Sequence, residues 1–226
     1  EKIAEQFRKI LDTSMAHHAY VHIDVEQYEL LSLTHDTFMQ VLMERPYRKY
    51  PHIGIVCQAY LKESESHLRT LIQFAKDRGT PFAIRLVKGA YWDYEQAHAE
   101  QMDWPCPVFD NKAETDHQYE KLTEQLIIAF PHIRPIIGSH NARSLAVAIT
   151  SMEKHGLNKE DVEFQMLNGM AEEFRDYIAS QGFRIRQYCP IGEFIPGMSY
   201  LVRRLLENTA NQSFLRMHGH ESKNIE

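Results

Sequence analysis

The amino-acid sequence predicts an α/β protein of the (β/α)8, TIM-type barrel class. Short apolar runs alternate with amphipathic stretches, an order that indicates a parallel sheet with helical crossovers, either doubly wound or closed into a barrel. Polar residues stand near the end of every run, whereas a doubly wound sheet would gather its site at one switch point. No G-x-G-x-x-G motif follows any run. These observations favour the barrel.

Strands are predicted for the apolar runs, because each is rich in β-branched or aromatic residues and short for a helix. The runs are AYVHIDV (19–25), HIGIVCQAYL (52–61), PFAIRLVKGAY (81–91), RPIIGSHN (134–141), VEFQMLNGM (162–170) and FRIRQYCPIG (183–192). The polar residues at or near their carboxyl ends are Asp24, Gln58, Arg85 with Lys88, His140 with Asn141, Gln165 with Asn168, and Tyr188.

Helices are predicted between these runs. The periodic stretches are 1–16, 64–78, 114–130, 142–155 and 172–181, and Gly79, Gly156 and Gly182 are suitable C-caps. No Pro/Gly/Ser-rich boundary divides the chain, so residues 1–226 are expected to form one barrel domain. The predicted strands make up about six βα units, whereas a closed barrel needs eight. We therefore expect that two units are absent upstream or that the sheet closes in another way.

The composition is that of an ordinary globular protein, with 43% hydrophobic and 25% charged residues. A net charge of −6, with no Lys/Arg block, argues against nucleic acid as a main partner. No apolar run approaches about 18 residues, and the first helix is amphipathic, unlike a signal peptide. The 3 cysteines form no metal-binding pair and no disulfide framework, so no metal site is expected. These features indicate a reducing compartment such as the cytoplasm or mitochondrial matrix.

A predicted helix near the C-terminus has an unusual polar face. Its polar stripe consists of Tyr200, Arg203, Arg204 and Glu207, at positions i, i+3, i+4 and i+7, and its leucines fall on the other side. Two adjacent arginines beside an aromatic ring suit a carboxylate on a small apolar body. The alternative is a solvated charged face on a surface helix.

The segment IRLVKGAYWD (84–93) carries a second signal. A guanidinium at Arg85, in the middle of a strand, is costly unless it meets an anion or carboxylate. Lys88 follows at the strand end, and Gly89 with Ala90 would allow a ligand to approach the backbone. Two interpretations remain open: an anionic or electron-rich ligand over this strand, or a structural bridge between Arg85 and Asp24.

Two further strand ends carry weaker signals. The segment GSHN (138–141), followed at once by a helix, offers backbone and side-chain donors for a phosphate, although His-Asn is also a common loop former. Asp24 could orient Arg85, contact a substrate amine or serve as a helix N-cap.

A set of motifs connects these signals. HIDVEQ, QAY (58–60), IRLVKGAYWD, P-V-F-x-x-K-x-x-T-D (107–116), SHNA, EFQMLNGM, Y-x-P-I-G (188–192) and YLVRRLLENTANQSF (200–214) stand in this order. Over about residues 20–215 the sequence thereby resembles the flavin-dependent proline dehydrogenase domain, in particular that of the PutA-type bifunctional bacterial enzymes. The resemblance implies oxidation of L-proline to Δ1-pyrroline-5-carboxylate by hydride transfer to flavin N5, with electrons passed to a quinone.

The resemblance also implies roles for individual residues. Asp24 and Arg85 would be catalytic. FAD would be bound by Val25, Gln58, Arg85, Lys88, Gly89, Ala90, Ser139, His140, Asn141, Gln165 and Glu207. Proline would contact Tyr91, Tyr188, Tyr200, Arg203 and Arg204, the last two on a lid helix where Glu207 would also orient an arginine. Ser139 replaces the usual threonine and keeps its hydroxyl, while a tyrosine at 188 indicates proline rather than hydroxyproline as substrate.

Departures from the family pattern limit these expectations. The first two barrel strands of the family, with a lysine that helps bind the carboxylate, have no counterpart, nor does the aldehyde dehydrogenase domain of the bifunctional relatives. One alternative is therefore an impaired, truncated barrel that only binds proline or flavin. Another is a Schiff-base barrel lyase that uses Lys88. The resemblance implies a cytoplasmic location and peripheral association with the inner membrane.

Overall fold

The computed structural model describes residues 1–193, 195, 198 and 202. In chain order the elements are α1 (Lys2–Ala16), β1 (Val21–Ile23), the 3-10 helix η1 (Tyr28–Leu30), α2 (Leu31–Met43), β2 (Ile53–Gln58), α3 (Ser64–Arg78), β3 (Phe82–Val87), α4 (Trp92–Met102), α5 (Lys112–Ile128), β4 (Ile133–Gly138), α6 (Ala142–Lys154), β5 (Glu163–Leu167), α7 (Glu172–Ser180) and β6 (Arg184–Tyr188).

Within this described part, six parallel strands form one sheet in the order β1-β2-β3-β4-β5-β6. Strands that follow one another in sequence are also neighbours in space, as in a barrel, whereas a doubly wound sheet reverses its order at a switch point. The described β1 and β6 each pair with one strand only, so the sheet is an open, curled arc of a barrel. The predicted α/β barrel class is confirmed, with six of its strands in the described residues.

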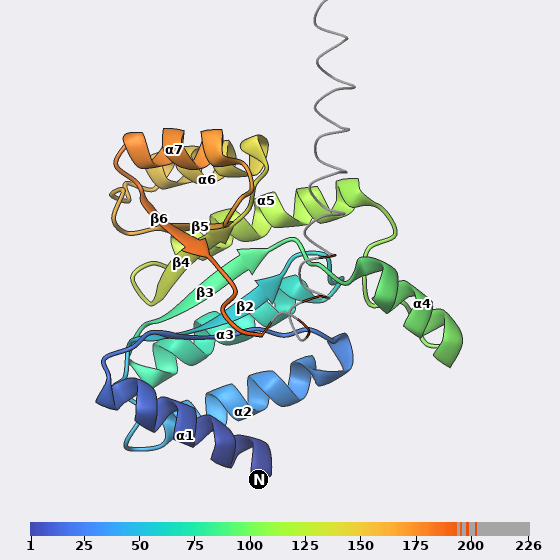
Figure 1. Ribbon diagram of the computed structural model, residues 1–226, viewed down its shortest axis with the longest axis vertical. Helices are drawn as coiled ribbons and strands as arrows, with labels where there is room; N and C mark the ends of the chain where they lie inside the picture. Colours follow the sequence, from blue (N-terminus) through green and yellow to red (C-terminus); the bar gives the residue numbers. More distant parts are fainter. Residues whose placement is uncertain (194, 196–197, 199–201, 203–226) are drawn as a thin grey trace, which may run out of the picture.

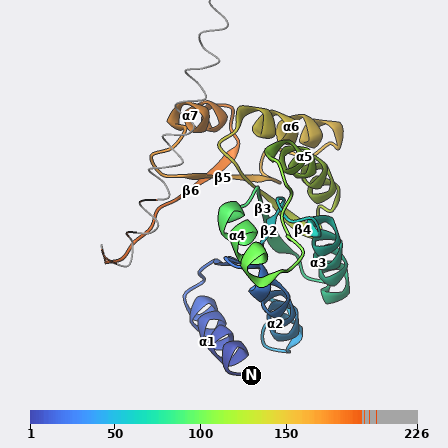
Figure 2. The ribbon, with the colours of Figure 1, turned by 90° about the vertical axis from the view of Figure 1, so that its right-hand side faces the viewer.

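The helices cover the outer face of this arc. Figures 1 and 2 show α1 and α2 at one end of the arc and α6 and α7 at the other, with α3 and α5 between them. Helix α4 lies beyond the carboxyl ends of β2 and β3, apart from this layer (Figure 1). The carboxyl ends of the strands therefore point toward the side of the molecule on which α4 lies (Figure 1).

Most predicted helices are present, with bounds within two residues of the prediction. Helix α3 ends at Gly79, whose φ of 71° is left-handed as a C-cap requires. Helices α2 and α4 were not predicted. Helix α2 could have been predicted from the sequence, because its buried residues Phe38, Val41 and Leu42 have helical spacing. Helix α4 buries only Glu95 and Ala99, so it has no apolar stripe to detect.

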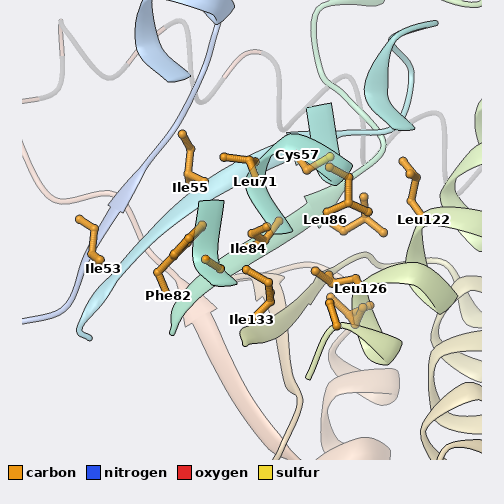
Figure 3. Packing of buried hydrophobic residues seen from close by; sticks show 14 of the residues in the cluster. Ile53, Ile55, Cys57, Leu71, Phe82, Ile84, Leu86, Leu122, Leu126 and Ile133 are labelled. Carbon is orange, nitrogen blue, oxygen red and sulfur yellow. The ribbon is translucent and has the colours of Figure 1, made fainter. Parts of the chain in front are cut away.

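The hydrophobic core lies between the sheet and the helices. Figure 3 shows residues of β2 and β3, among them Ile55 and Ile84, packed against Leu71 of α3 and Leu126 of α5. Each of these side chains is 0% exposed, and burial of one aliphatic side chain stabilises the fold by about 1.5–3 kcal/mol. Because side chains alternate along a strand, the residues between these core positions, including Arg85, face the inside of the arc.

Candidate functional site

An ion pair stands at the centre of the candidate site. The Arg85 guanidinium donates from Nη2 to Oδ1 of Asp24, which follows β1. The Arg85 side chain is 14% exposed and lies inside the arc, while that of Asp24 is 52% exposed and lies at its open edge. The bridge between Asp24 and Arg85, one of the two interpretations of this arginine, is therefore present. Asp24 is not a helix N-cap, because η1 is preceded by Gln27.

Arg85 has a second partner on the other side of the arc. Its Nη1 donates to Oε1 of Gln165 on β5, 3.3 Å away. Gln165 Nε2 donates in turn to Oε1 of Glu163, at 2.7 Å. Glu163 also accepts two hydrogen bonds from Arg186 of β6, at 2.8 and 3.0 Å. A continuous polar chain thus runs from Asp24 to Arg186 inside the curled sheet.

Burial and charge act in opposite directions on this chain. Burial lowers the pKa of Arg85, which stays far above neutrality as arginines do. Burial alone would raise the pKa of Glu163, but hydrogen bonds from Arg186 and Gln165 outweigh it and hold that pKa below its ordinary value. Each arginine of the chain is thus paired with a carboxylate, which is how the buried charges of Arg85 and Glu163 are tolerated.

The end of β3 holds a second cation. Lys88 Nζ donates to Oδ1 of Asp116 on α5 at 2.5 Å, and it lies 5.6 Å from the centre of the Tyr119 ring. This side chain is 22% exposed. The arrangement holds a positive charge near the strand ends, where the phosphates of a nucleotide cofactor could be neutralised.

Packing against Tyr60 requires glycine at position 89. Its φ is 129°, and a Cβ there would lie 2.4 Å from the ring of Tyr60. Tyr60 N donates to the Lys88 carbonyl at 2.7 Å, which fixes the turn that contains Gly89. The predicted room for a ligand beside Gly89 is thus partly filled by Tyr60. Its neighbour Ala90 is exposed.

The end of β4 is organised by its own hydrogen bonds. Asn141 is the N-cap of α6, its Oδ1 accepting from Ser144 N at 3.1 Å, and its own N donates to Ser139 Oγ at 3.1 Å. His140 Nε2 accepts from Leu167 N at 2.8 Å, so this nitrogen carries no proton. The segment is a helix N-terminus with ordered polar side chains, consistent with a phosphate-binding role.

The remaining predicted residues are partly brought together. Gln58 Nε2 donates to the Val25 carbonyl at 2.8 Å, which ties the end of β2 to the segment after β1. Tyr91 is the N-cap residue of α4, and Tyr188, the last residue of β6, is 45% exposed. Tyr200, Arg203, Arg204 and Glu207, with the predicted lid helix, lie outside the described residues.

Several residues of the site were not predicted, namely Glu163, Arg186, Asp116 and Tyr119. Glu163 could have been found, because it stands two residues before Gln165 and so shares its face of the strand. The partners of Lys88 and Glu163 come from α5 and β6, and their proximity depends on which elements lie side by side in the fold. That arrangement has no local sequence signal.

Two other observations bear on function. Among the residues that the structure describes, no helix could cross a membrane and no group of His, Cys, Asp or Glu could hold a metal ion. A shallow hollow of about 530 Å³ lies between α1 and the beginning of β1, at the opposite end of the strands from Arg85. Its lining includes Ile10, Thr13 and Val21, with one cation, Lys9, and it does not resemble a cofactor site.

Comparison with known proteins places this geometry in context. A family model described as proline dehydrogenase matches residues 2–217. The chain is 35% identical over 203 residues to the bifunctional protein PutA of Escherichia coli K12, covering 86% of this chain and 15% of that protein. It is 30% identical over 212 residues to proline dehydrogenase 2 of Bacillus subtilis 168, covering 94% of this chain and 62% of that protein.

A solved structure is similar as well. PutA from Bdellovibrio bacteriovorus, inactivated by N-propargylglycine, superposes with a TM-score of 0.91 at 48% identity. The match covers 94% of this chain and 22% of that one. The chain thus spans less than a quarter of the PutA proteins named here.

Proposed function

Because the chain belongs to the proline dehydrogenase family, we propose that it carries the FAD-dependent oxidation of L-proline to Δ1-pyrroline-5-carboxylate. In this reaction the ring of proline loses one C–H and one N–H hydrogen, a C=N bond forms, and two electrons pass to an acceptor. The observation that carries the proposal is the polar chain on the inner face of the strands, in which Arg85 reaches Asp24 just after β1, on the carboxyl side where barrel enzymes place their sites.

The substrate class has independent support. The similar Bdellovibrio PutA is inactivated by N-propargylglycine, which is an amino acid with a substituted nitrogen, as proline is. An enzyme that accepts such a compound recognises a secondary amine next to a carboxylate. We propose that Tyr91 and Tyr188 contribute to the corresponding pocket, together with Tyr200, Arg203 and Arg204 beyond the described segments.

The donors at the strand ends fit FAD. Arg85 and Gln58 would lie along the flavin, and Lys88 with Ser139, His140 and Asn141 would bind the phosphates and the remaining part of the cofactor. A positive lysine and the N-terminus of the 13-residue helix α6 suit a pyrophosphate group. Val25, Gly89, Ala90 and Gln165 would complete the contacts, with Glu207 on the lid helix. When bound, FAD supplies the two-electron acceptor for the reaction.

The protein's own residues would then position the substrate and the cofactor and neutralise their charges. Arg85 is held by Asp24 on one side and by Gln165 on the other, so its guanidinium keeps one orientation without reorganisation during the reaction. Asp24, at the exposed end of the pair, is the group that can accept a hydrogen bond from the substrate amine. We propose that electrons leave to a quinone, with the protein cytoplasmic and associated peripherally with the inner membrane.

A second candidate is a barrel that binds proline or flavin without turnover. A Schiff-base lyase is disfavoured, because Lys88 forms an ion pair with Asp116 and a Schiff-base lysine reacts as the neutral amine.

A turnover assay separates these functions. The purified chain is supplied with FAD, L-proline and a dye acceptor, and both dye reduction and the pyrroline product are measured. Stoichiometric product and reduced dye support the proposal. Binding of FAD or proline without product supports the second candidate, and a borohydride-trapped lysine adduct with a carbonyl substrate supports the lyase.

A further inference from the structure

A buried carboxylate that the proposed reaction does not use lies next to the site. Glu163 is 8% exposed and stands on β5, facing the inside of the arc. Its oxygens accept from Arg186 Nε at 2.8 Å, from Arg186 Nη2 at 3.0 Å and from Gln165 Nε2 at 2.7 Å. A carboxylate so completely hydrogen-bonded is well fixed, and it can fix its neighbours.

The chemistry of these groups determines the orientation of Gln165. A guanidinium can only donate hydrogen bonds, and a carboxylate can only accept them. An amide placed between Arg85 and Glu163 must therefore donate to Glu163 and accept from Arg85. With the amide reversed, its NH₂ group would face the Arg85 donor and its oxygen would face the carboxylate, and both hydrogen bonds would be lost.

From this geometry we infer that Glu163 is a positioning residue, which orients the Arg85 guanidinium through the side chain of Gln165. Its consequence for flavin binding rests on the proposed function, because Arg85 is proposed to contact FAD. The coupling between Glu163 and Arg85 is independent of any ligand. The competing explanation is that Glu163 serves only to join β5 to β6 through Arg186.

The substitution Glu163→Gln tests this inference. Glutamine has nearly the same shape, but it can donate as well as accept, so the orientation of Gln165 is no longer determined. The matched control is Glu120→Gln, which removes a carboxylate from an arginine pair on α5 and α6, where Glu120 Oε1 lies 2.6 Å from Arg143 Nε. Both substitutions break one ion pair, but only the first touches the polar chain to Arg85.

The first readout needs no flavin. Nuclear magnetic resonance of the Arg85 guanidinium hydrogens in the full 226-residue chain reports how firmly that group is held. Arg85 would lose a hydrogen bond that involves one charged group, so we expect hydrogen exchange at Arg85 to be at least roughly tenfold faster in Glu163→Gln. We expect no change in Glu120→Gln, and thermal unfolding shows whether each variant is folded.

A double-mutant cycle provides the decisive comparison. Gln165→Met removes the amide while keeping a similar volume, and it is combined with Glu163→Gln. If Glu163 acts through Gln165, the double variant should show the same Arg85 exchange rate as Gln165→Met alone. Wild-type exchange in Glu163→Gln, or additive effects in the double variant, would overturn the inference in favour of a purely structural role.

FAD affinity is the second readout. In a wild-type chain that binds FAD, we expect Glu163→Gln to raise the dissociation constant about tenfold while Glu120→Gln leaves it unchanged. Unchanged affinity in Glu163→Gln would overturn the link to the cofactor. If the wild-type chain binds no FAD, the proposed function fails, while the exchange rates still decide whether Glu163 orients Arg85.

Discussion

Arg85 on β3 is joined to Asp24, which follows β1, across the intervening strand β2. Two strands that are not neighbours in the sheet are thus tied through their side chains on its inner face. Second neighbours in a sheet are about 9–10 Å apart, a distance that the long arginine side chain spans over β2. The pair lies where the proposed reaction takes place.

Removal of the Asp24 charge should affect function more than stability. Asp24 is about half exposed, so solvent screens its charge, and without it Arg85 keeps its hydrogen bond to Gln165. In Asp24→Asn we expect the rate of proline oxidation to fall tenfold or more, which corresponds roughly to the loss of one hydrogen bond to a charged group. We expect the midpoint of urea unfolding to be nearly unchanged. Asp110→Asn, which breaks the exposed pair with Lys62, is the control and should retain full activity. Full activity in Asp24→Asn would contradict a catalytic role.

The turn at Gly89 should tolerate no side chain. In Gly89→Ala the new methyl group would meet the Tyr60 ring, in a backbone conformation that L-residues rarely adopt. We expect a loss of roughly 2–4 kcal/mol of unfolding free energy in urea titrations. Gly156→Ala provides the comparison, because Gly156 has a φ of 70° and open space around it, and it should lose only about 1 kcal/mol. Equal losses at the two positions would show that contact with Tyr60 is unimportant.

Stability should decrease in mild acid because of His35. This residue of α2 is 7% exposed, and burial together with the nearby His67 lowers its pKa to about 4. In the unfolded chain this histidine binds its proton near pH 6.5. The free energy of unfolding is therefore highest above about pH 6.5, and it falls as the pH is lowered from about 6.5 to 4, by up to about 1.4 kcal/mol per pH unit. Urea midpoints at several pH values should decline less steeply in His35→Leu. The exposed His117, changed to Leu, should leave the wild-type pH dependence intact, and a wild-type slope in His35→Leu would refute this origin.

Lys88 should contribute to cofactor affinity through its charge. Lys88→Met keeps the length of the side chain and removes the cation, so we expect FAD to bind about tenfold more weakly. Asp116→Asn should have a smaller effect, since Lys88 keeps its charge and loses only its orientation. Affinities from titration of FAD fluorescence check both variants. An affinity reduced more by Asp116→Asn than by Lys88→Met would contradict a phosphate contact by Lys88.

The sequence predicts those features that depend on local periodicity. The strands were recognised by composition, and the ends of α3 and α6 by Gly79 and Gly156. Helix α4 was missed because it buries only Glu95 and Ala99 and so has no apolar stripe. The pairing of Arg85 with Asp24 was one of two predicted alternatives, because a charged arginine in the middle of a buried strand needs an anionic partner.

Other parts of the site could not be predicted because they depend on which elements lie side by side in the fold. Arg186 meets Glu163 only because β6 pairs in parallel with β5, with Glu163 opposite Arg184. Asp116 meets Lys88 because α5 packs behind the end of β3, a relation across 28 residues. The motif P-V-F-x-x-K-x-x-T-D contains Asp116, yet it gives no indication of the lysine that this carboxylate holds.

The most direct test of the proposed function is the absorption spectrum of the FAD-loaded chain under anaerobic conditions, recorded before and after addition of L-proline. We predict that the main visible flavin band bleaches with L-proline and not with glycine, which has the carboxylate and amine but no ring. Bound FAD whose spectrum is unchanged by L-proline would contradict the proposal that these residues oxidise proline.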